Sequence, residues 1–237
     1  MRRLVEARNL PSLLNSGRVL KEDSTRRITI LDIGGGTEVF IKLHHDGGLV
    51  EILKRILLGS RARRSHYKSE LLREHHLPGP ASLGFVDIFD HHCRASAHFS
   101  ELLPDSRTLA HVIAENPDSP LIEAASKLIA ALHQSGLIHG DLKLTNLMVS
   151  AENLFFVDLD GLRRSASARL RARDIARFLV GLAETDVALA MTRAAFTRYC
   201  EALDVPETAL RDRVIAFAKS CQKKHLAKYQ RPTRPIL

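Results

Sequence analysis

The residues best suited to chemistry lie in one stretch, residues 137–161, with the sequence LIHGDLKLTNLMVSAENLFFVDLDG. Asp141 is followed by Lys143 and then by Asn146, and Asp158 comes seventeen positions after Asp141. Phosphoryl transfer needs a carboxylate that accepts the proton of the attacking hydroxyl, oxygen ligands for Mg²⁺, and a cation beside the transferred phosphate. We therefore predict Asp141 as the base, Asn146 and Asp158 as the metal ligands, and Lys143 as the cation.

Each of these residues has a simpler explanation when it is taken alone. An Asp-x-Lys pair is usually a solvated surface pair, and an aspartate at the end of a strand is usually a turn residue. The joint pattern is HGDLKxxN, then an apolar strand, then Asp-x-Asp-Gly. Because chance seldom produces all three parts in this order, the pattern favours a catalytic function.

The elements around this stretch predict an α+β fold. Strands are expected at 28–33, 39–43, 85–89 and 97–103, and a helix over 48–76. The glycines at 34–36 between the first two strands are typical of a hairpin turn. After residue 104 we expect a helix between the N-cap signal Ser119-Pro120 and the C-cap glycine Gly136, a small hairpin at 147–157, and helices from about Asp174 with a basic tail.

The motif residues resemble those of a known superfamily. HGDLKLTN resembles the catalytic loop of protein-kinase-like enzymes, and VDLDG resembles their metal-binding Asp-Phe-Gly turn. Further segments, VFIKL, HFSELL and RARDIARFL among them, follow the order of one branch, the lipopolysaccharide core kinases of the WaaP/InaA and Kdo type. The resemblance covers about residues 18–180 and implies a bilobal fold, with a small β-rich N-lobe over 1–102 and a mainly helical C-lobe over 103–237.

This resemblance implies a function and two cofactors. A kinase of this branch would use ATP and Mg²⁺ to phosphorylate a sugar hydroxyl, on heptose or Kdo, in the lipopolysaccharide inner core. Its expected place is the cytoplasm, with peripheral contact to the anionic inner face of the cytoplasmic membrane. The start of the chain lacks the apolar core of a secretory signal, which agrees with that expectation.

Four more site residues follow from the resemblance. Lys42, which closes the strand VFIK, resembles the lysine that holds the α- and β-phosphates of ATP. Its partner on the next helix would be Glu70, with Glu74 one turn later as the competitor. Glu101 and Leu103 in SELLP stand where the hinge backbone would bind adenine.

Two further residues are expected to stabilise the catalytic loop, and two positions depart from the superfamily pattern. Asp174 resembles the buried aspartate that braces the catalytic loop, and His139 is expected to brace that loop as well. The glycine-rich phosphate loop should precede the Lys42 strand by two strands, so its place falls on the glycine-free residues 21–25, KEDST. Asp160 replaces the usual glycine of the metal-binding turn, which makes it a second, weaker candidate ligand.

The composition and net charge of the chain limit the classes of molecule that it is expected to bind. The chain has 237 residues and a formal charge of +8, which fits a small globular protein with anionic partners. Tryptophan is absent and aromatic residues make up only 5%, so base-stacking platforms and DNA binding are not expected. The three cysteines, Cys93, Cys200 and Cys221, form no CxxC pair, which favours a reducing compartment.

Two basic runs suggest where an anionic acceptor and a membrane would bind. Residues 159–173 are too few for a peptide-presenting activation segment, so we expect the acceptor to be a small-molecule or saccharide hydroxyl. Arginines crowd this segment and its border, at Arg163, Arg164, Arg169, Arg171, Arg173 and Arg177. They form either a solvated face or a docking surface for an anionic acceptor. The second run, residues 54–68, is a candidate for contact with lipid headgroups.

Three alternatives stay open. The small atypical kinase of the threonylcarbamoyl-adenosine tRNA machinery also carries His-Gly-Asp, and its positive charge would serve tRNA. A pseudokinase that acts as a binding module in envelope assembly would explain the missing glycine-rich loop. A phosphotransferase for an aminoglycoside-like molecule would need an acidic acceptor pocket, against which the arginines argue.

Overall fold

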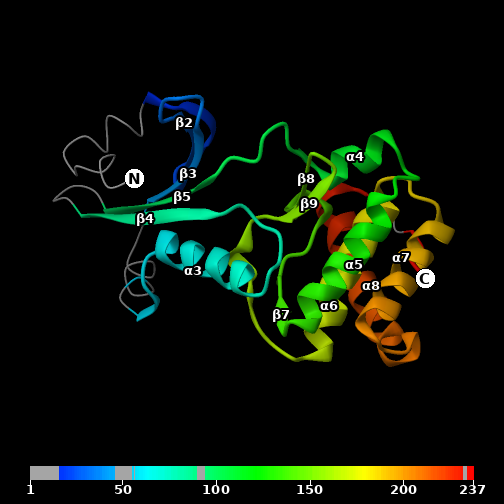
Figure 1. Ribbon diagram of the computed structural model, residues 1–237. Helices are drawn as coiled ribbons and strands as arrows, with labels where there is room; N and C mark the ends of the chain where they lie inside the picture. The colour runs from blue at the N-terminus through cyan, green and yellow to red at the C-terminus, as the bar shows by residue number, and fades with distance from the viewer. Residues whose placement is uncertain (1–15, 46–54, 56, 90–93, 232–233) are drawn as a thin grey trace. The chain divides into compact units, whose positions relative to one another are not determined.

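Figure 1 shows the chain in a computed structural model that describes residues 16–45, 55, 57–89, 94–231 and 234–237. Cys93, Lys54 and the predicted helix start near Gly48 lie outside the described residues. The chain divides into two compact units. Met1–Glu74 and Pro80–Leu103 belong to the first unit, and His75–Gly79 and Pro104–Leu237 belong to the second.

The first unit is built on an antiparallel sheet of five strands, in the order β1-β2-β3-β5-β4. The strands are β1 (Arg18–Glu22), β2 (Arg26–Asp32), β3 (Glu38–His45), β4 (Ser82–Phe89) and β5 (Arg94–Glu101). The predicted hairpin is present as β2 and β3. Gly34, Gly35 and Gly36 all have positive φ angles, of 94°, 66° and 75°, which residues with a side chain rarely adopt.

One face of this sheet carries an apolar core. Leu31, Val39, Ile41, Leu43 and Phe99 are buried together there. Helix α3 (Arg61–Glu74) contacts β3, β4 and β5, as Figure 1 shows for the β4 side. It buries Ala62 and Leu72. Most of α3 is polar, so its position is fixed by these two residues and by polar contacts.

The second unit is mainly helical. Its helices are α4 (Leu109–Glu115), α5 (Leu121–Gln134), α6 (Ala168–Glu184), α7 (Leu189–Leu203) and α8 (Arg211–Tyr229). Helix α5 packs on α7 and α6 packs on α8 (Figure 1). The aromatic side chains of Phe156, Phe178, Phe196 and Tyr199 are fully buried in this unit. Among the residues that the structure describes, no helix is long and apolar enough to cross a membrane.

Two small sheets in the second unit carry the motif stretch. One contains β6 (Arg107–Thr108), β8 (Leu147–Ser150) and β9 (Asn153–Phe156), in the order β6-β8-β9. The other pairs β7 (Leu137–Ile138) with β10 (Arg163–Arg164). The catalytic motif therefore starts directly after β7, and the Asp-x-Asp-Gly turn ends directly before β10.

The predicted start of one helix is corrected, and the structure describes most of the basic tail. Helix α6 begins at Ala168 rather than near Asp174, because arginine, alanine and leucine in this segment are good helix formers. In the basic tail, α8 continues to Tyr229, and Arg231 and Ile236 beyond it contact the unit. Arg231 pairs with Glu184 at 2.9 Å, and Ile236 is buried.

Candidate active site

The carboxylate of Asp141 is contacted by two cations in the second unit. Lys143 Nζ lies 2.7 Å from Oδ2, and Arg177 Nη1 lies 2.6 Å from Oδ1. Lys143 comes from the same loop, whereas Arg177 comes from α6. The structure thus brings together the predicted base and the predicted cation, and it adds an arginine that the sequence analysis placed only in a basic run.

Asn146 is oriented toward the same loop. Its Nδ2 donates to the backbone carbonyl of Asp141 at 2.8 Å and lies 3.5 Å from Oδ2 of Asp141. Asn146 ends a short 3-10 turn, Leu144–Asn146, and is buried. With Nδ2 engaged in this way, the amide oxygen Oδ1 is the atom that Asn146 can offer to a cation.

Asp158 is held close to Asn146 through the backbone. The N–H of Val157, the residue before Asp158, donates to the Asn146 carbonyl at 3.0 Å. Asp158 itself is exposed and has left-handed backbone angles, with φ and ψ both 55°. This conformation costs free energy in a residue other than glycine, although aspartate and asparagine adopt it more readily than most.

The donor set fits a magnesium ion that shares its ligands with a nucleotide. Mg²⁺ in such sites takes one or two protein oxygen ligands, and phosphates and water fill the remaining positions. Asn146 and Asp158 supply an amide oxygen and a carboxylate of that kind. Among the described residues, no group of three or more His, Cys, Asp or Glu side chains could hold a metal ion.

Two glycines let the catalytic loop and the Asp-x-Asp-Gly turn touch. A Cβ atom on Gly140 would lie 2.7 Å from the Gly161 carbonyl oxygen, and one on Gly161 would lie 2.5 Å from the His139 carbonyl oxygen. Gly140 also has a positive φ of 86°. The glycine displaced from the usual position by Asp160 is therefore present one residue later, at Gly161, where the close approach requires it.

Asp174 and His139 brace the loop, as the sequence predicts. The Asp174 carboxylate is fully buried and accepts the Gly140 N–H at 3.0 and 3.2 Å. His139 Nε2 donates to the Val157 carbonyl at 3.1 Å, which ties the catalytic loop to the strand end before Asp158. His133 lies on the other side of Asp174 and hydrogen-bonds through Nδ1 to the Tyr199 hydroxyl at 2.7 Å.

We expect Asp174→Ala to lower the free energy of unfolding by about 2–3 kcal/mol, because the substitution leaves the partly buried Gly140 N–H without its charged acceptor. Chemical denaturation would measure the loss. Asp118→Ala, at an exposed position of the same unit, is the matched control and should change stability by less than about 0.5 kcal/mol. Equal stability of the wild type and Asp174→Ala would contradict the bracing role.

Burial lowers the pKa of both His133 and His139 below the ordinary value of 6.5. Below about pH 6.5 the unfolded chain binds protons at these two side chains that the folded chain does not bind. The free energy of unfolding should therefore fall as the pH is lowered from 7.5 to 5.5, by up to about 1.4 kcal/mol per pH unit for each histidine. Urea unfolding at both pH values measures this, and His133→Gln should flatten the dependence. A stability that is the same at both pH values would refute it.

In the first unit, Lys42 and Glu70 lie on neighbouring elements. Lys42 is half-buried on β3, where it stands opposite Ile28 of β2 and His98 of β5. Glu70 lies on α3 and accepts hydrogen bonds from Arg73 at 2.6 and 3.1 Å, which lower the pKa of its carboxyl group. Arg73 is thus the hydrogen-bonded partner of Glu70 within α3, and the pairing of Lys42 with Glu70 or Glu74 stays a prediction.

The predicted hinge residues lie where the chain leaves the first unit. Glu101 ends β5, and its N–H donates to the Ala81 carbonyl at 2.9 Å. Leu103 is buried and is the last residue of this unit. Their backbone role toward adenine stays a prediction.

The predicted phosphate-covering segment forms the turn between β1 and β2. Asp23 Oδ1 accepts the N–H groups of Thr25 and Arg26, both at 3.0 Å. The hydrogen bond from the Thr25 hydroxyl, followed by these backbone bonds and the Arg26 side chain, holds the pKa of Asp23 well below its usual range. Two of the backbone donors that a phosphate would need are therefore occupied by this carboxylate.

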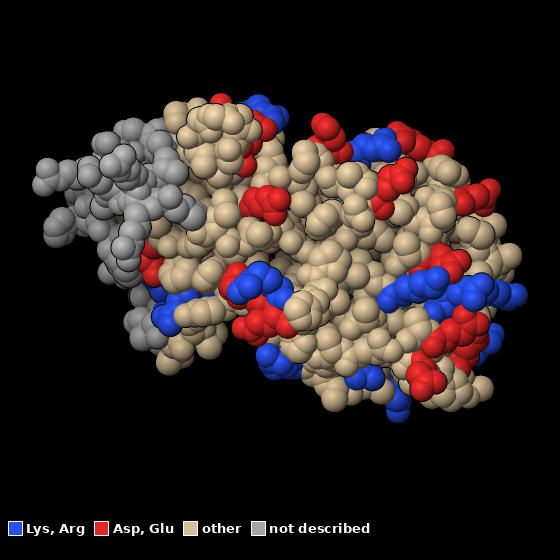
Figure 2. Space-filling model, in the orientation of Figure 1, with Lys and Arg blue, Asp and Glu red and all other residues tan. Residues whose placement is uncertain are grey.

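The arginine-rich segment separates into two groups. Arg163, Arg164 and Arg169 are exposed, whereas Arg171, Arg173 and Arg177 are half-buried on α6. The spacing of Arg177 three residues after Asp174 is the signal that could have placed it beside the catalytic loop. On the face drawn in Figure 2, Lys and Arg side chains alternate with Asp and Glu over the second unit, so no single-sign patch covers this face.

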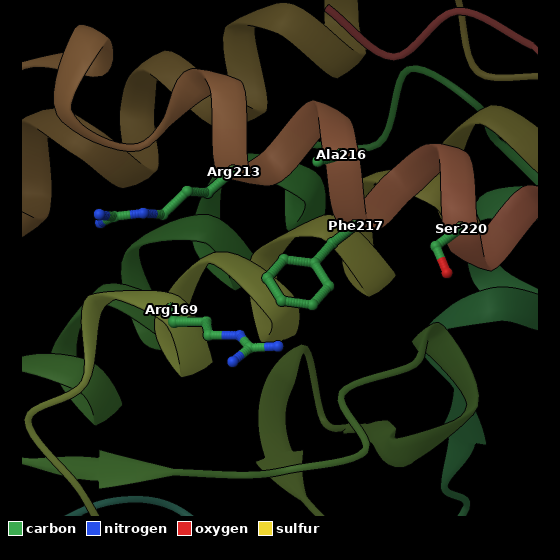
Figure 3. Close-up of a pocket in the computed structure, with 5 residues that line it drawn as sticks. All are labelled: Arg169, Arg213, Ala216, Phe217 and Ser220. Carbon is green, nitrogen blue, oxygen red and sulfur yellow. The ribbon is translucent and has the colours of Figure 1, made fainter.

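A shallow cavity of about 320 Å³ lies between α6 and α8. Its lining residues are Arg169, Arg213, Ala216, Phe217 and Ser220. Figure 3 shows Arg169 and Phe217 reaching toward each other from the two helices, with Arg213 beside them. None of the predicted catalytic or metal-binding residues lines this cavity.

Comparison with known structures agrees with this architecture. A structure titled "WaaP in complex with acyl carrier protein" superposes with a TM-score of 0.67 and 21% identity, and the match covers 94% of this chain and 95% of that one. A structure titled "Amicoumacin kinase hAmiN in complex with AMP-PNP, Ca2+ and Ami" superposes with a TM-score of 0.62 and 13% identity, over 91% and 87% of the two chains. These similarities establish the expected kinase-like α+β fold.

Two sequence comparisons differ in how much of the chain they match: one is a short local similarity, and the other covers most of the chain. A curated protein of Methanosarcina mazei, "Probable bifunctional tRNA threonylcarbamoyladenosine biosynthesis protein", is 44% identical over only 39 residues. That segment is 16% of this chain and 7% of that protein. The model of the lipopolysaccharide kinase (Kdo/WaaP) family matches residues 13–201, which include both the Lys42 strand and the catalytic stretch. The chain therefore belongs to the lipopolysaccharide kinase (Kdo/WaaP) family, and it is a kinase.

Proposed function

We propose that the protein transfers the γ-phosphoryl group of ATP to a sugar hydroxyl, on heptose or Kdo, in the inner core of lipopolysaccharide. The observation that carries the proposal is the cluster around Asp141, in which a cation from the same loop and the Asn146 amide converge on one carboxylate. Family membership supports a saccharide acceptor.

The site residues divide the work of phosphoryl transfer. Asp141 orients the acceptor hydroxyl and accepts its proton, and Lys143 provides positive charge beside the transferred phosphate. Asn146 and Asp158 would hold Mg²⁺, which neutralises charge on the phosphates when it is bound. Asp158 is exposed, and the Asn146 side chain is fixed by its hydrogen bond to the Asp141 carbonyl, which supports these two roles.

The other roles belong to the first unit. Lys42 would bind the α- and β-phosphates, with Glu70 as its partner, and the backbone of Glu101 and Leu103 would bind adenine. Lys42 is half-buried in the middle of the sheet, and this position supports its proposed role, because the surrounding strands would hold its side chain in place for phosphate binding. Since Asp23 occupies donors in the β1–β2 turn, phosphate binding would depend more on Lys42 and Mg²⁺ than on that turn.

The short segment after Asp158 supports an acceptor other than a peptide. Only residues 159–167 separate Asp158 from α6, fewer than the sequence analysis assumed. The exposed arginines Arg163, Arg164 and Arg169 form the proposed docking surface for an anionic core saccharide. The proposed place is the inner face of the cytoplasmic membrane, although Arg55 of the second basic run already contacts Asp87 at 3.3 Å.

The acceptor can be tested by mass spectrometry of the product. Dephosphorylated lipopolysaccharide would be incubated with the protein, ATP and Mg²⁺, and the core oligosaccharide would then be released and fragmented. We expect the mass to increase by one phosphoryl group, localised to heptose or Kdo. An unmodified core, under conditions in which the protein consumes ATP, would reject this acceptor.

A second candidate has one specific observation in its favour, the short match to the tRNA threonylcarbamoyladenosine protein. In that case the positive charge would bind tRNA. Filter binding of bulk tRNA at increasing salt separates the two candidates. Tight binding with a steep salt dependence, together with no label on lipopolysaccharide, would favour the tRNA role. Failure to bind nucleotide at all would instead favour a pseudokinase binding module.

A further inference from the structure

Helix α6 contacts the catalytic loop through Asp174 and Arg177, which lie three positions apart, and more weakly through Arg173, whose Nη2 lies 3.4 Å from the Gly140 carbonyl oxygen. Asp174 accepts the N–H of Gly140, and Arg177 donates to the carbonyl of the same glycine at 2.8 Å. The same Arg177 nitrogen also donates to Oδ1 of Asp141 at 2.6 Å. One turn of α6 therefore holds Gly140 by both its backbone polar groups and holds the neighbouring carboxylate as well.

This contact differs from an ordinary surface ion pair. Side chains of Arg177 and Asp141 are 33% and 34% exposed, so the pair by itself adds little to stability. The pair instead fixes the orientation of the Asp141 carboxylate, because Arg177 Nη1 donates both to the Gly140 carbonyl oxygen and to Oδ1 of Asp141. Lys143 does not provide the same restraint, since it is 55% exposed and its flexible stem comes from the loop itself.

We propose that Arg177 is a positioning residue that fixes the carboxylate of Asp141 for catalysis. It keeps Oδ1 turned toward α6, and this leaves Oδ2, the oxygen beside Lys143, to accept the proton of the acceptor hydroxyl. The proposal rests on the proposed function, in which Asp141 accepts that proton. In this role Arg177 acts through Asp141 and the neighbouring Gly140 carbonyl, and not by binding ATP or the acceptor.

The test compares three variants in steady-state phosphoryl transfer. Arg177→Met keeps the aliphatic stem and removes the donor, Arg177→Lys restores one charged donor, and Arg193→Met removes the same charge from an exposed position on α7. For Arg177→Met we expect kcat to fall about 10–100-fold. The KM values for ATP and acceptor should change by less than about twofold, since binding contacts are kept. Arg177→Lys should recover part of kcat, and Arg193→Met should match the wild type.

A double-mutant cycle with Asp141→Asn then separates positioning from direct binding. If Arg177 acts through Asp141, adding Arg177→Met to Asp141→Asn should cause little further loss. A full additional loss, or a raised KM for the acceptor, would mean that Arg177 binds the acceptor and would overturn the proposal. Wild-type kcat in Arg177→Met would overturn it while leaving the kinase function intact. An inactive wild type with every acceptor would reject the proposed function and this inference with it.

Discussion

Asp141→Asn is expected to reduce phosphoryl transfer by about 10²–10⁴-fold, the usual contribution of a positioned general base. Asparagine has nearly the same shape and keeps an oxygen for the Arg177 hydrogen bond, but it cannot accept the proton of the acceptor hydroxyl. The measurement is kcat for phosphoryl transfer to dephosphorylated lipopolysaccharide.

The fold should survive this substitution. Asp141 is partly exposed, so the loss of its ion pairs with Lys143 and Arg177 should cost no more than about 1 kcal/mol in stability. The melting temperature and the affinity for Mg-ATP are therefore the controls, with Asp212→Asn as a matched exposed variant. Near-normal transfer by Asp141→Asn would remove this residue from the base role.

Asp158→Ala is expected to weaken Mg-dependent nucleotide binding more than about tenfold, because the site loses its main predicted carboxylate ligand. Isothermal titration of ATP with and without Mg²⁺ measures the effect. The affinity for ATP without Mg²⁺ should change little.

The left-handed backbone of Asp158 calls for a second variant. Alanine is strained at φ 55°, so Asp158→Ala also costs some stability. Asparagine tolerates this conformation and removes the charge alone, so Asp158→Asn separates the lost ligand from backbone strain. If both variants bind Mg-ATP as tightly as the wild type, Asp158 is not the metal ligand, and Asp160 becomes the next residue to test.

Elements with local signals could be predicted from the sequence. The β2–β3 hairpin was predicted from three glycines between β-branched runs, and α5 from its apolar repeat and the terminal Gly136. The cluster of Asp141, Lys143 and Asn146 was predicted because all three lie within one short loop. Short-range spacing determines such features, so the sequence contains the information that they need.

Features that depend on tertiary contacts were not predicted. Pro78 belongs to the second unit because its carbonyl accepts the Phe156 N–H, a pairing of residues far apart in the chain. The sequence shows Arg177 only as one of several arginines. Its partner, Asp141, lies 36 positions earlier in the chain, and the two residues meet only because α6 packs on the catalytic loop. The Asp23 contacts in the β1–β2 turn were not predicted either. The prediction for residues 21–25 considered only that this segment contains no glycine, and not that the Asp23 carboxylate could accept the backbone N–H groups of the turn.

The most direct measurement of the central claim is label transfer from γ-labelled ATP with Mg²⁺. Dephosphorylated lipopolysaccharide, bulk tRNA, a generic peptide and an aminoglycoside would be offered in parallel to the wild type and to Asp141→Asn. We predict label on lipopolysaccharide alone, and its loss in the variant. Label on another acceptor, or label on lipopolysaccharide that persists in Asp141→Asn, would contradict the account.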